Sequence, residues 1–136
     1  VLPESVASRI HVAAVSMEDR EVNATVVNAV QRVSSVVTQR SLIEAFGLTV
    51  AEAMWKKAPV VASAVGGIRD QIDDGVDGVL VDPADGLAWA EAVRDLLLFP
   101  ERAQEMGLAA HESVRREFLS NRHLQDLLQI VADLVG

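Results

Sequence analysis

Residues 34–65 read SSVVTQRSLIEAFGLTVAEAMWKKAPVVASAV, and this stretch decides the fold. It predicts four elements in order: a strand at 34–38, a loop at 41–46, a helix from about Gly47 or Leu48 to Lys57, and a strand at 60–65. Gly66 and Gly67 then terminate the second strand. Two apolar strands joined by a helix form a βαβ unit, the building block of a parallel sheet.

The rest of the chain extends the same alternation. We expect a strand at 9–15, a helix at 19–33, a helical turn at 68–72, a strand at 79–81, and helices at about 85–98, 100–118 and 121–135. The predicted class is α/β, with a Rossmann-like parallel sheet, flanking helices and a helical C-terminal tail over about 85–135. Because only four strands are expected, residues 1–136 are interpreted as a single, incomplete domain, the later part of a larger one.

Composition narrows the functional classes. The net charge is −8 and the 12 Lys and Arg residues are scattered, which argues against a nucleic-acid partner. Cysteine is absent, so the chain offers no disulfide and no thiolate metal site. We expect no membrane span, because no apolar run approaches about 20 residues. We also expect no metal ligands, and a cytoplasmic location.

The chemistry is concentrated in residues 44–54, EAFGLTVAEAM. Glu44 is expected at a loop tip on the carboxyl edge of the sheet, where doubly wound sheets bind ligands. The first helical N–H groups, around Gly47, Leu48 and Thr49, carry partial positive charge and can bind a phosphate. Glu52 follows inside the helix and is suited to hold a ribose diol.

The same spacing also fits a purely structural interpretation. Thr49 and Glu52 match a capping box, and so do Ser41 and Glu44. Gly66-Gly67 is compatible with any strand-to-helix turn. Spacing alone favours capping over ligand binding.

A set of motifs resembles the retaining glycosyltransferases of the glycogen-synthase-like and sucrose-synthase-like group (family 4 type). They are Glu44 and Glu52 separated by seven residues around Phe46-Gly47-Leu48, then Ala53-Met54, Pro59-Val60-Val61-Ala62, Val65-Gly66-Gly67-Ile68 and the segment 74–83, DGVDGVLVDP. Residues 49–56, TVAEAMWK, are most similar to the trehalose-forming members, which join a nucleotide-activated glucose to glucose. The resemblance covers nearly the whole chain and implies the two-domain GT-B fold.

The resemblance also implies roles for individual residues. Glu44 would be catalytic and contact the donor sugar near its anomeric carbon, and Phe46 and Gly47 would offer N–H groups to that sugar. Leu48 and Thr49 would bind the diphosphate, and Glu52 the ribose. Configuration would be retained, with preorganised donors stabilising the leaving diphosphate and no obligatory metal or other cofactor.

The chain departs from the family pattern in two respects. Ala45 stands where the family usually has Gly, and a positive φ there would cost an alanine roughly 1 kcal/mol or more. The diphosphate-clamping Arg and Lys, and the N-terminal GT-B domain that supplies the acceptor site, have no counterpart here. We therefore expect the 136 residues alone to be inactive.

Other conspicuous residues have structural explanations. His11 is expected in the core or at a strand end, His111 and His123 in solvent, and Trp55 and Trp89 as packing anchors. An apolar stripe at helical spacing should pack in the core, and any exposed part offers a surface for self-association; it comprises Leu119, Leu124, Leu127, Leu128, Val131 and Leu134.

Three functional hypotheses remain. The first is hexosyl transfer from a nucleotide-activated sugar, with nucleoside-diphosphate glucose as the expected donor and trehalose as the expected product, within a longer enzyme. The second is a non-catalytic α/β module for binding or interaction. The third is binding of another phosphorylated metabolite. The base of the donor and the identity of the acceptor stay open.

Overall fold

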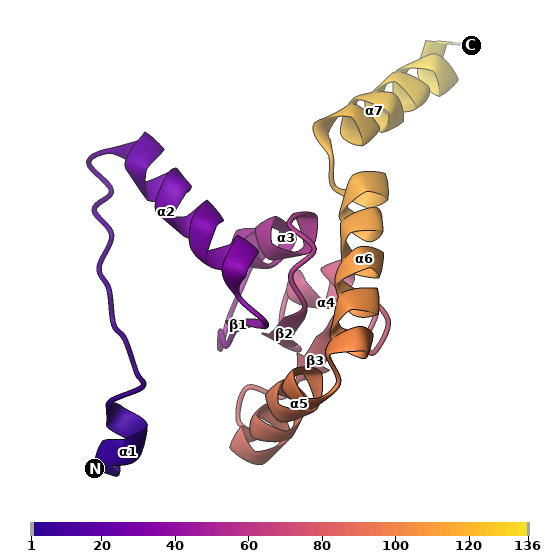
Figure 1. Ribbon diagram of the computed structural model, residues 1–136. Coiled ribbons are helices and arrows are strands. Elements are labelled where there is room, and N and C mark those ends of the chain that lie inside the picture. The colour runs from indigo at the N-terminus through magenta and orange to yellow at the C-terminus, as the bar shows by residue number, and fades with distance from the viewer. Residues whose placement is uncertain (1, 136) are drawn as a thin grey trace. The chain divides into compact units, whose positions relative to one another are not determined.

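The computed structural model describes residues 2–135 (Figure 1). Its elements in chain order are α1 (Glu4–Ala7), α2 (Arg20–Val33), β1 (Val37–Gln39), α3 (Leu48–Trp55), β2 (Val60–Ser63), α4 (Ile68–Gln71), β3 (Val79–Val81), α5 (Gly86–Leu98), α6 (Pro100–Glu117) and α7 (Ser120–Val135). Every predicted helix is present, and three of the four predicted strands are, with small shifts at their ends. The α/β class with a helical C-terminal tail is confirmed.

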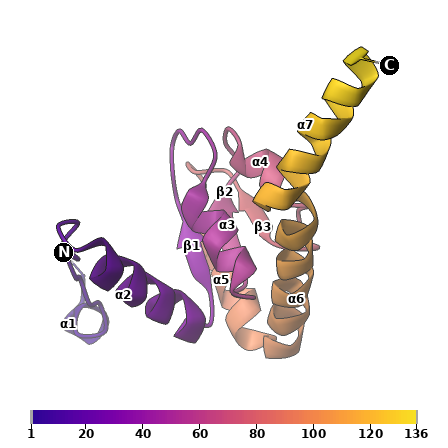
Figure 2. The same ribbon diagram turned by 90° about the horizontal axis from the view of Figure 1, so that it is seen from above.

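The sheet is parallel and has the strand order β1-β2-β3 within the described residues. Val37 pairs with Val60, and Val61 pairs with Val79, so the carboxyl ends of all three strands lie at one edge. Figure 2 shows the connections after β1 and β2 at this edge, opposite the corner between α5 and α6.

The predicted strand at residues 9–15 is wrong. This segment has no regular secondary structure, and the side chain of Val12 is 93% exposed. A strand is stable only when its backbone N–H and C=O groups pair with a neighbour. In the described part of the chain all strand pairing joins β1, β2 and β3. Apolar composition therefore indicated a strand where no partner is available.

Helices cover both faces of the sheet, and each face has its own core. On one face Met54 of α3 packs with Val60 of β2 and Ala110 of α6. On the other face Val61 of β2 packs with Trp89 of α5. The alternation of Val60 and Val61 is the strand period of two, buried on both sides. The adjacent apolar residues of β2 thus hold α3 and α5 in place.

The chain divides into two compact units between Val30 and Gln31. The first contains α1 and most of α2, whose start is capped by Asp19: its Oδ1 accepts hydrogen bonds from the N–H groups of Glu21 and Val22, both at 3.0 Å. The second contains the sheet and the remaining helices. All of the candidate functional residues belong to this second unit.

Candidate functional site

The loop after β1 turns into α3 at Gly47, which adopts a left-handed conformation with φ 79°. Helix α3 starts at the next residue, as the sequence predicts, and no side chain caps it. The capping box of Thr49 and Glu52 is therefore wrong: Thr49 already lies inside the helix. Among the described hydrogen bonds none is donated by the N–H of Leu48 or Thr49, whereas Val50 N–H donates to Gly47 O at 2.9 Å. The first turn thus presents two unbonded amide donors, the arrangement that binds anions.

Glu44 lies in this loop and is half-buried. The hydroxyl of Ser41 donates to Glu44 Oε2 at 3.4 Å, and Gln39 Nε2 donates to Ser41 Oγ at 2.9 Å. Residues 42–46 form no helix, so the second capping box, of Ser41 and Glu44, is also wrong. The hydroxyl contacts the carboxylate directly and orients it.

The Gly66-Gly67 turn at the end of β2 packs closely against the backbone of the Glu44 loop. A Cβ on Gly66 would stand 1.8 Å from the backbone oxygen of Glu44, and one on Gly67 would stand 2.2 Å from that of Ala45. Gly67 N–H also donates to Glu44 O at 3.3 Å. Only residues without a side chain allow this approach. The sequence left this pair as a generic turn, but it fixes where Glu44 lies.

Ala45 does not need a positive φ. Among the described non-glycine residues only Lys57 has one, at φ 63°, so the expected strain at Ala45 is absent. The left-handed residue of this loop is Gly47 instead. The alanine at position 45 therefore carries no left-handed backbone strain.

Arg40 ties the loop after β1 to the loop after β3. Its Nε and Nη2 donate to Pro83 O at 3.1 and 3.0 Å, and its guanidinium lies 5.8 Å from the centre of the Trp89 ring. Trp89 Nε1 in turn donates to Asp82 O at 3.1 Å. Sequence reasoning missed Arg40, although a cation placed directly after a strand at the ligand-binding edge is a readable signal.

The predicted site residues follow one another along this corner. Phe46 and Leu48 are exposed, at 45% and 64%, and Thr49 is exposed as well. Gly47 is buried and Glu52, in the second turn of α3, is half-buried. The Phe46 ring meets Phe118 edge-on, with 6.1 Å between ring centres. The sequence-predicted residues thus line one loop and one helix start at the carboxyl edge.

The histidines differ from expectation. His11 is exposed in the irregular segment, so its predicted core position is wrong. His111 is not simply solvated: its ring stacks on Trp55 with 4.5 Å between centres, and its Nδ1 lies 2.6 Å from Trp55 O. The side chain of His123 lies outside the described residues. Trp89 is a packing anchor, at 6% exposure, whereas Trp55 is 41% exposed and is covered in part by His111.

The tail stripe is also not core within the described residues. On α7, Leu124, Leu127 and Leu134 are exposed, at 57%, 47% and 80%. The predicted burial of this stripe is therefore wrong for these positions. A helix face of this kind needs a partner to become buried, and self-association through it stays a prediction.

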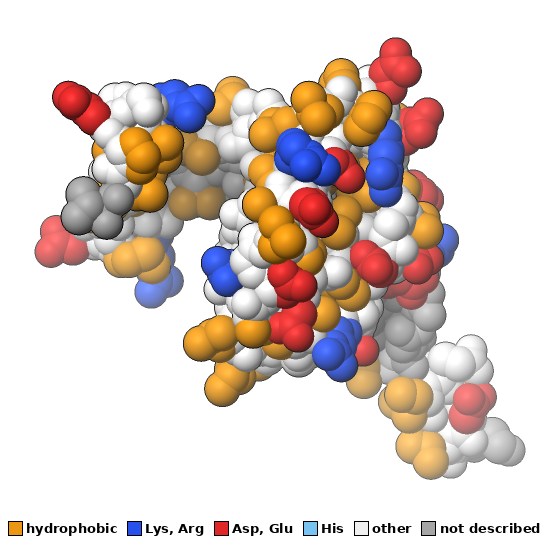
Figure 3. All heavy atoms as spheres, turned by 90° about the horizontal axis from the view of Figure 1, so that it is seen from below, with side chains coloured by type: hydrophobic (Ala, Val, Ile, Leu, Met, Phe, Trp, Pro, Cys, Tyr) orange, Lys and Arg blue, Asp and Glu red, His pale blue; other side chains and the backbone are white. Residues whose placement is uncertain are grey.

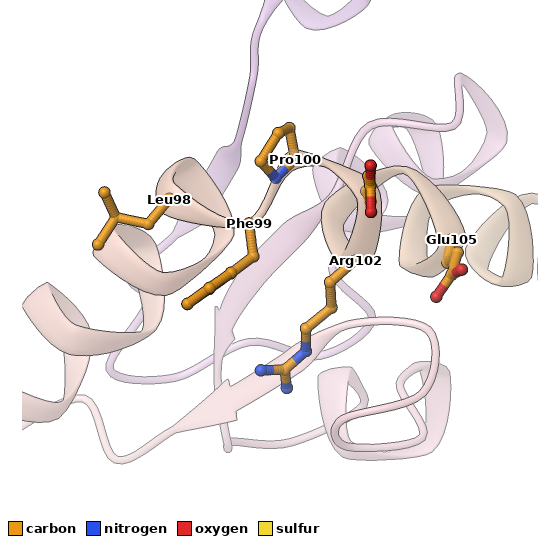
Figure 4. A pocket seen from close by; sticks show the side chains of 6 residues that line it. Leu98, Phe99, Pro100, Arg102 and Glu105 are labelled. Atoms are coloured by element: carbon orange, nitrogen blue, oxygen red, sulfur yellow. The ribbon is translucent and has the colours of Figure 1, made fainter.

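Three hollows are described, and none of them is lined by Glu44, Gly47 or Glu52. One of about 650 Å³ lies between α5 and α6, where Phe99, Pro100 and Arg102 gather (Figure 4). A neighbouring hollow is lined by Ser35 and Pro59, which precede β1 and β2. These two hollows therefore lie at the amino edge of the sheet. A third, of about 450 Å³, has Gln71 and Phe118 in its wall. This third hollow adjoins the corner, because Gln71 bonds the backbone oxygen of Phe46 and Phe118 contacts the Phe46 ring.

The arrangement of the charged side chains bears on two kinds of site, a basic surface and a group of metal ligands. On the face shown in Figure 3, basic side chains are separated by acidic ones and form no continuous basic surface. Among the described residues no three His, Asp or Glu side chains are grouped to hold a metal ion. No helix in the described chain is both long and apolar enough to span a bilayer.

The sequence profile of the family described as "Glycosyl transferases group 1" matches residues 20–113. The chain belongs to this family. It is 49% identical over 115 residues to a trehalose synthase from Pyrococcus horikoshii, covering 85% of this chain and 27% of that protein. It is 45% identical over 85 residues to a D-inositol 3-phosphate glycosyltransferase from Xylanimonas cellulosilytica, covering 62% of this chain and 20% of that protein. The chain thus spans about a quarter of the length of the curated relatives it matches.

Solved structures show the same fold. The chain superposes on a sucrose-phosphate synthase from Thermosynechococcus elongatus with a TM-score of 0.72 and 32% identity, over 89% of this chain and 29% of that chain. Anabaena HepE in complex with UDP-glucose superposes with a TM-score of 0.69 at 21% identity, over 78% of this chain and 30% of that chain, a likeness of fold alone. The architecture is therefore that of the GT-B C-terminal domain expected from the resemblance.

Proposed function

We propose that this chain is part of a longer enzyme that transfers a hexosyl group, with retention, from a nucleoside-diphosphate sugar to an acceptor sugar. The observation that carries the proposal is the corner at Gly47, where two unbonded helix amides follow Glu44 and precede Glu52 along the chain. The relatives named trehalose synthase support glucose as the transferred sugar and trehalose as the product.

In the proposed reaction the bond between the anomeric carbon and the diphosphate oxygen breaks. A bond forms between that carbon and an acceptor hydroxyl oxygen, and the hydroxyl proton passes to the leaving diphosphate. The amides of Leu48 and Thr49 stabilise the charge that develops on the diphosphate. Glu44 contacts the donor sugar, with the Phe46 and Gly47 amides beside it, and Glu52 accepts hydrogen bonds from the ribose hydroxyls. The Leu48 and Thr49 amides stabilise the leaving diphosphate without an obligatory metal ion.

The described chain is proposed to supply part of the donor site only. The relatives are about four times as long, and the resemblance assigns the acceptor site and the diphosphate-clamping Arg and Lys to parts of the family without a counterpart here. We expect no glycosyl transfer by the 136 residues on their own. Turnover of a radiolabelled nucleotide-glucose donor by this chain would contradict that expectation.

The binding half of the proposal is tested by calorimetric titration with ADP-glucose, UDP-glucose and free nucleotide. We expect weak binding, lowered about tenfold or more by Glu52→Ala, because a hydrogen bond to a charged group is lost. Glu105→Ala is the matched control, since Glu105 is an exposed carboxylate on α6 beside the amino-edge hollow. Absence of nucleotide binding would favour the non-catalytic module, and binding indifferent to Glu52 would favour another phosphorylated metabolite.

A further inference from the structure

Gln71, the last residue of α4, is a buried polar side chain that the proposed function does not use. It is only 3% exposed, and its Nε2 donates a hydrogen bond to the backbone oxygen of Phe46. Its Oε1 is buried without a hydrogen-bond partner in the described protein. A buried and unpaired amide oxygen is costly, so a position that retains one calls for an explanation.

The side chain lies directly against the start of α3. Its Oε1 would be 3.2 Å from a Cβ placed on Gly47, and Ile68 Cγ1 would be 2.8 Å from the same point. Gln71 therefore bonds Phe46 and lies beside Gly47 at the peptide that joins these two residues. Ile68 and Gln71, one turn apart on α4, form the wall on which this peptide rests.

The geometry of that peptide makes the contact directional. A peptide unit is planar and trans here, so its C=O and N–H point in opposite directions. When Gln71 holds the Phe46 oxygen on the α4 side, the Gly47 N–H is turned to the other side. Because Gly47 tolerates both positive and negative φ, this peptide can flip easily unless something holds it.

We propose that Gln71 is a positioning residue that locks the Phe46–Gly47 peptide and so aims the Gly47 N–H at the donor sugar. The inference rests on the proposed function, in which that amide contacts the sugar. Gln71 itself touches no substrate. Its loss leaves the diphosphate donors of Leu48 and Thr49 in place, because these belong to the first turn of α3.

The first experiment compares two ligands in the Gln71→Met variant, which keeps the side-chain length and removes the donor. We expect the affinity for nucleoside-diphosphate glucose to fall about tenfold, the loss of about one good hydrogen bond, and that for free nucleoside diphosphate to change less than about twofold. Gln104→Met is the control, because Gln104 is an exposed glutamine on α6 beside the hollow that Ser35 and Pro59 line. An equal fall for both ligands would mean a general loss of structure and overturns the inference.

The second experiment needs no ligand. Nuclear magnetic resonance of the unsubstituted chain should show Gln71 side-chain amide protons that exchange slowly with water and a Gly47 amide proton that exchanges fast. In Gln71→Met, the orientation of the Gly47 N–H, measured by residual dipolar coupling, should change, whereas in Gln104→Met it should not. Fast exchange at Gln71, or an unchanged Gly47 vector, overturns the positioning role. If the vector changes but no nucleotide binds, the positioning role stands and the proposed function fails.

Discussion

Replacing Gly66 by alanine should displace the Glu44 loop and lower nucleotide-sugar affinity by about a hundredfold or more, because the Glu44 carboxylate and the Gly47 corner move together. The new Cβ would stand 1.8 Å from the Glu44 backbone oxygen, and Gly66 has φ 47°. Neither problem is relieved by rotating a side chain. Left-handed strain and overpacking together should lower the free energy of unfolding by about 2–4 kcal/mol.

Gly75→Ala is the matched control for this variant. Gly75 also has a positive φ, at 79°, but an added Cβ meets nothing within 4 Å. It should lower the free energy of unfolding by about 1 kcal/mol from backbone strain and leave binding unchanged. Urea unfolding and calorimetric titration measure the two effects. If Gly66→Ala changes the free energy of unfolding and the affinity no more than Gly75→Ala does, the turn does not fix the position of the Glu44 loop.

Replacing Gly107 by alanine should lower the free energy of unfolding by about 2–3 kcal/mol, although alanine is the better helix former. Gly107 is buried in α6, and its Cβ would stand 2.2 Å from the backbone oxygen of Lys57. Lys57 follows the end of α3 in a left-handed conformation; its N–H donates to Met54 O and Ala58 N–H donates to Ala53 O, each at 3.0 Å. This paired closure of the helix resists displacement.

The control here is Gly86→Ala, at the start of α5. The nearest atom to an added Cβ would be Nη2 of Arg40, at 3.9 Å, which is an ordinary van der Waals distance. We expect Gly86→Ala to be neutral or to stabilise the protein by about 0.5–1 kcal/mol, as alanine does in helices. Both variants are compared by urea unfolding. A neutral Gly107→Ala would contradict the close approach of α6 to the end of α3.

Sequence patterns located most elements because their signals are local. The helix over residues 20–33 follows from apolar spacing, and β2 from an unbroken apolar run after Pro59. The failures were of another kind. Residues 9–15 have strand composition but pair with no strand in the described part of the chain. Thr49 and Glu52 have the spacing of a capping box, but the helix already begins at Leu48.

The sequence by itself determined the alternation of strands and helices, the family, and the placement of Glu44 and Glu52 on either side of a helix start. The tertiary structure alone decided that Gly66 packs against the Glu44 backbone and that Gln71 donates a hydrogen bond to the Phe46 oxygen. The physical reason is separation along the chain. Helix and strand periods arise between near neighbours, whereas the contacts that build this corner join residues more than 20 positions apart and exist only once parallel strands bring their carboxyl ends to one edge.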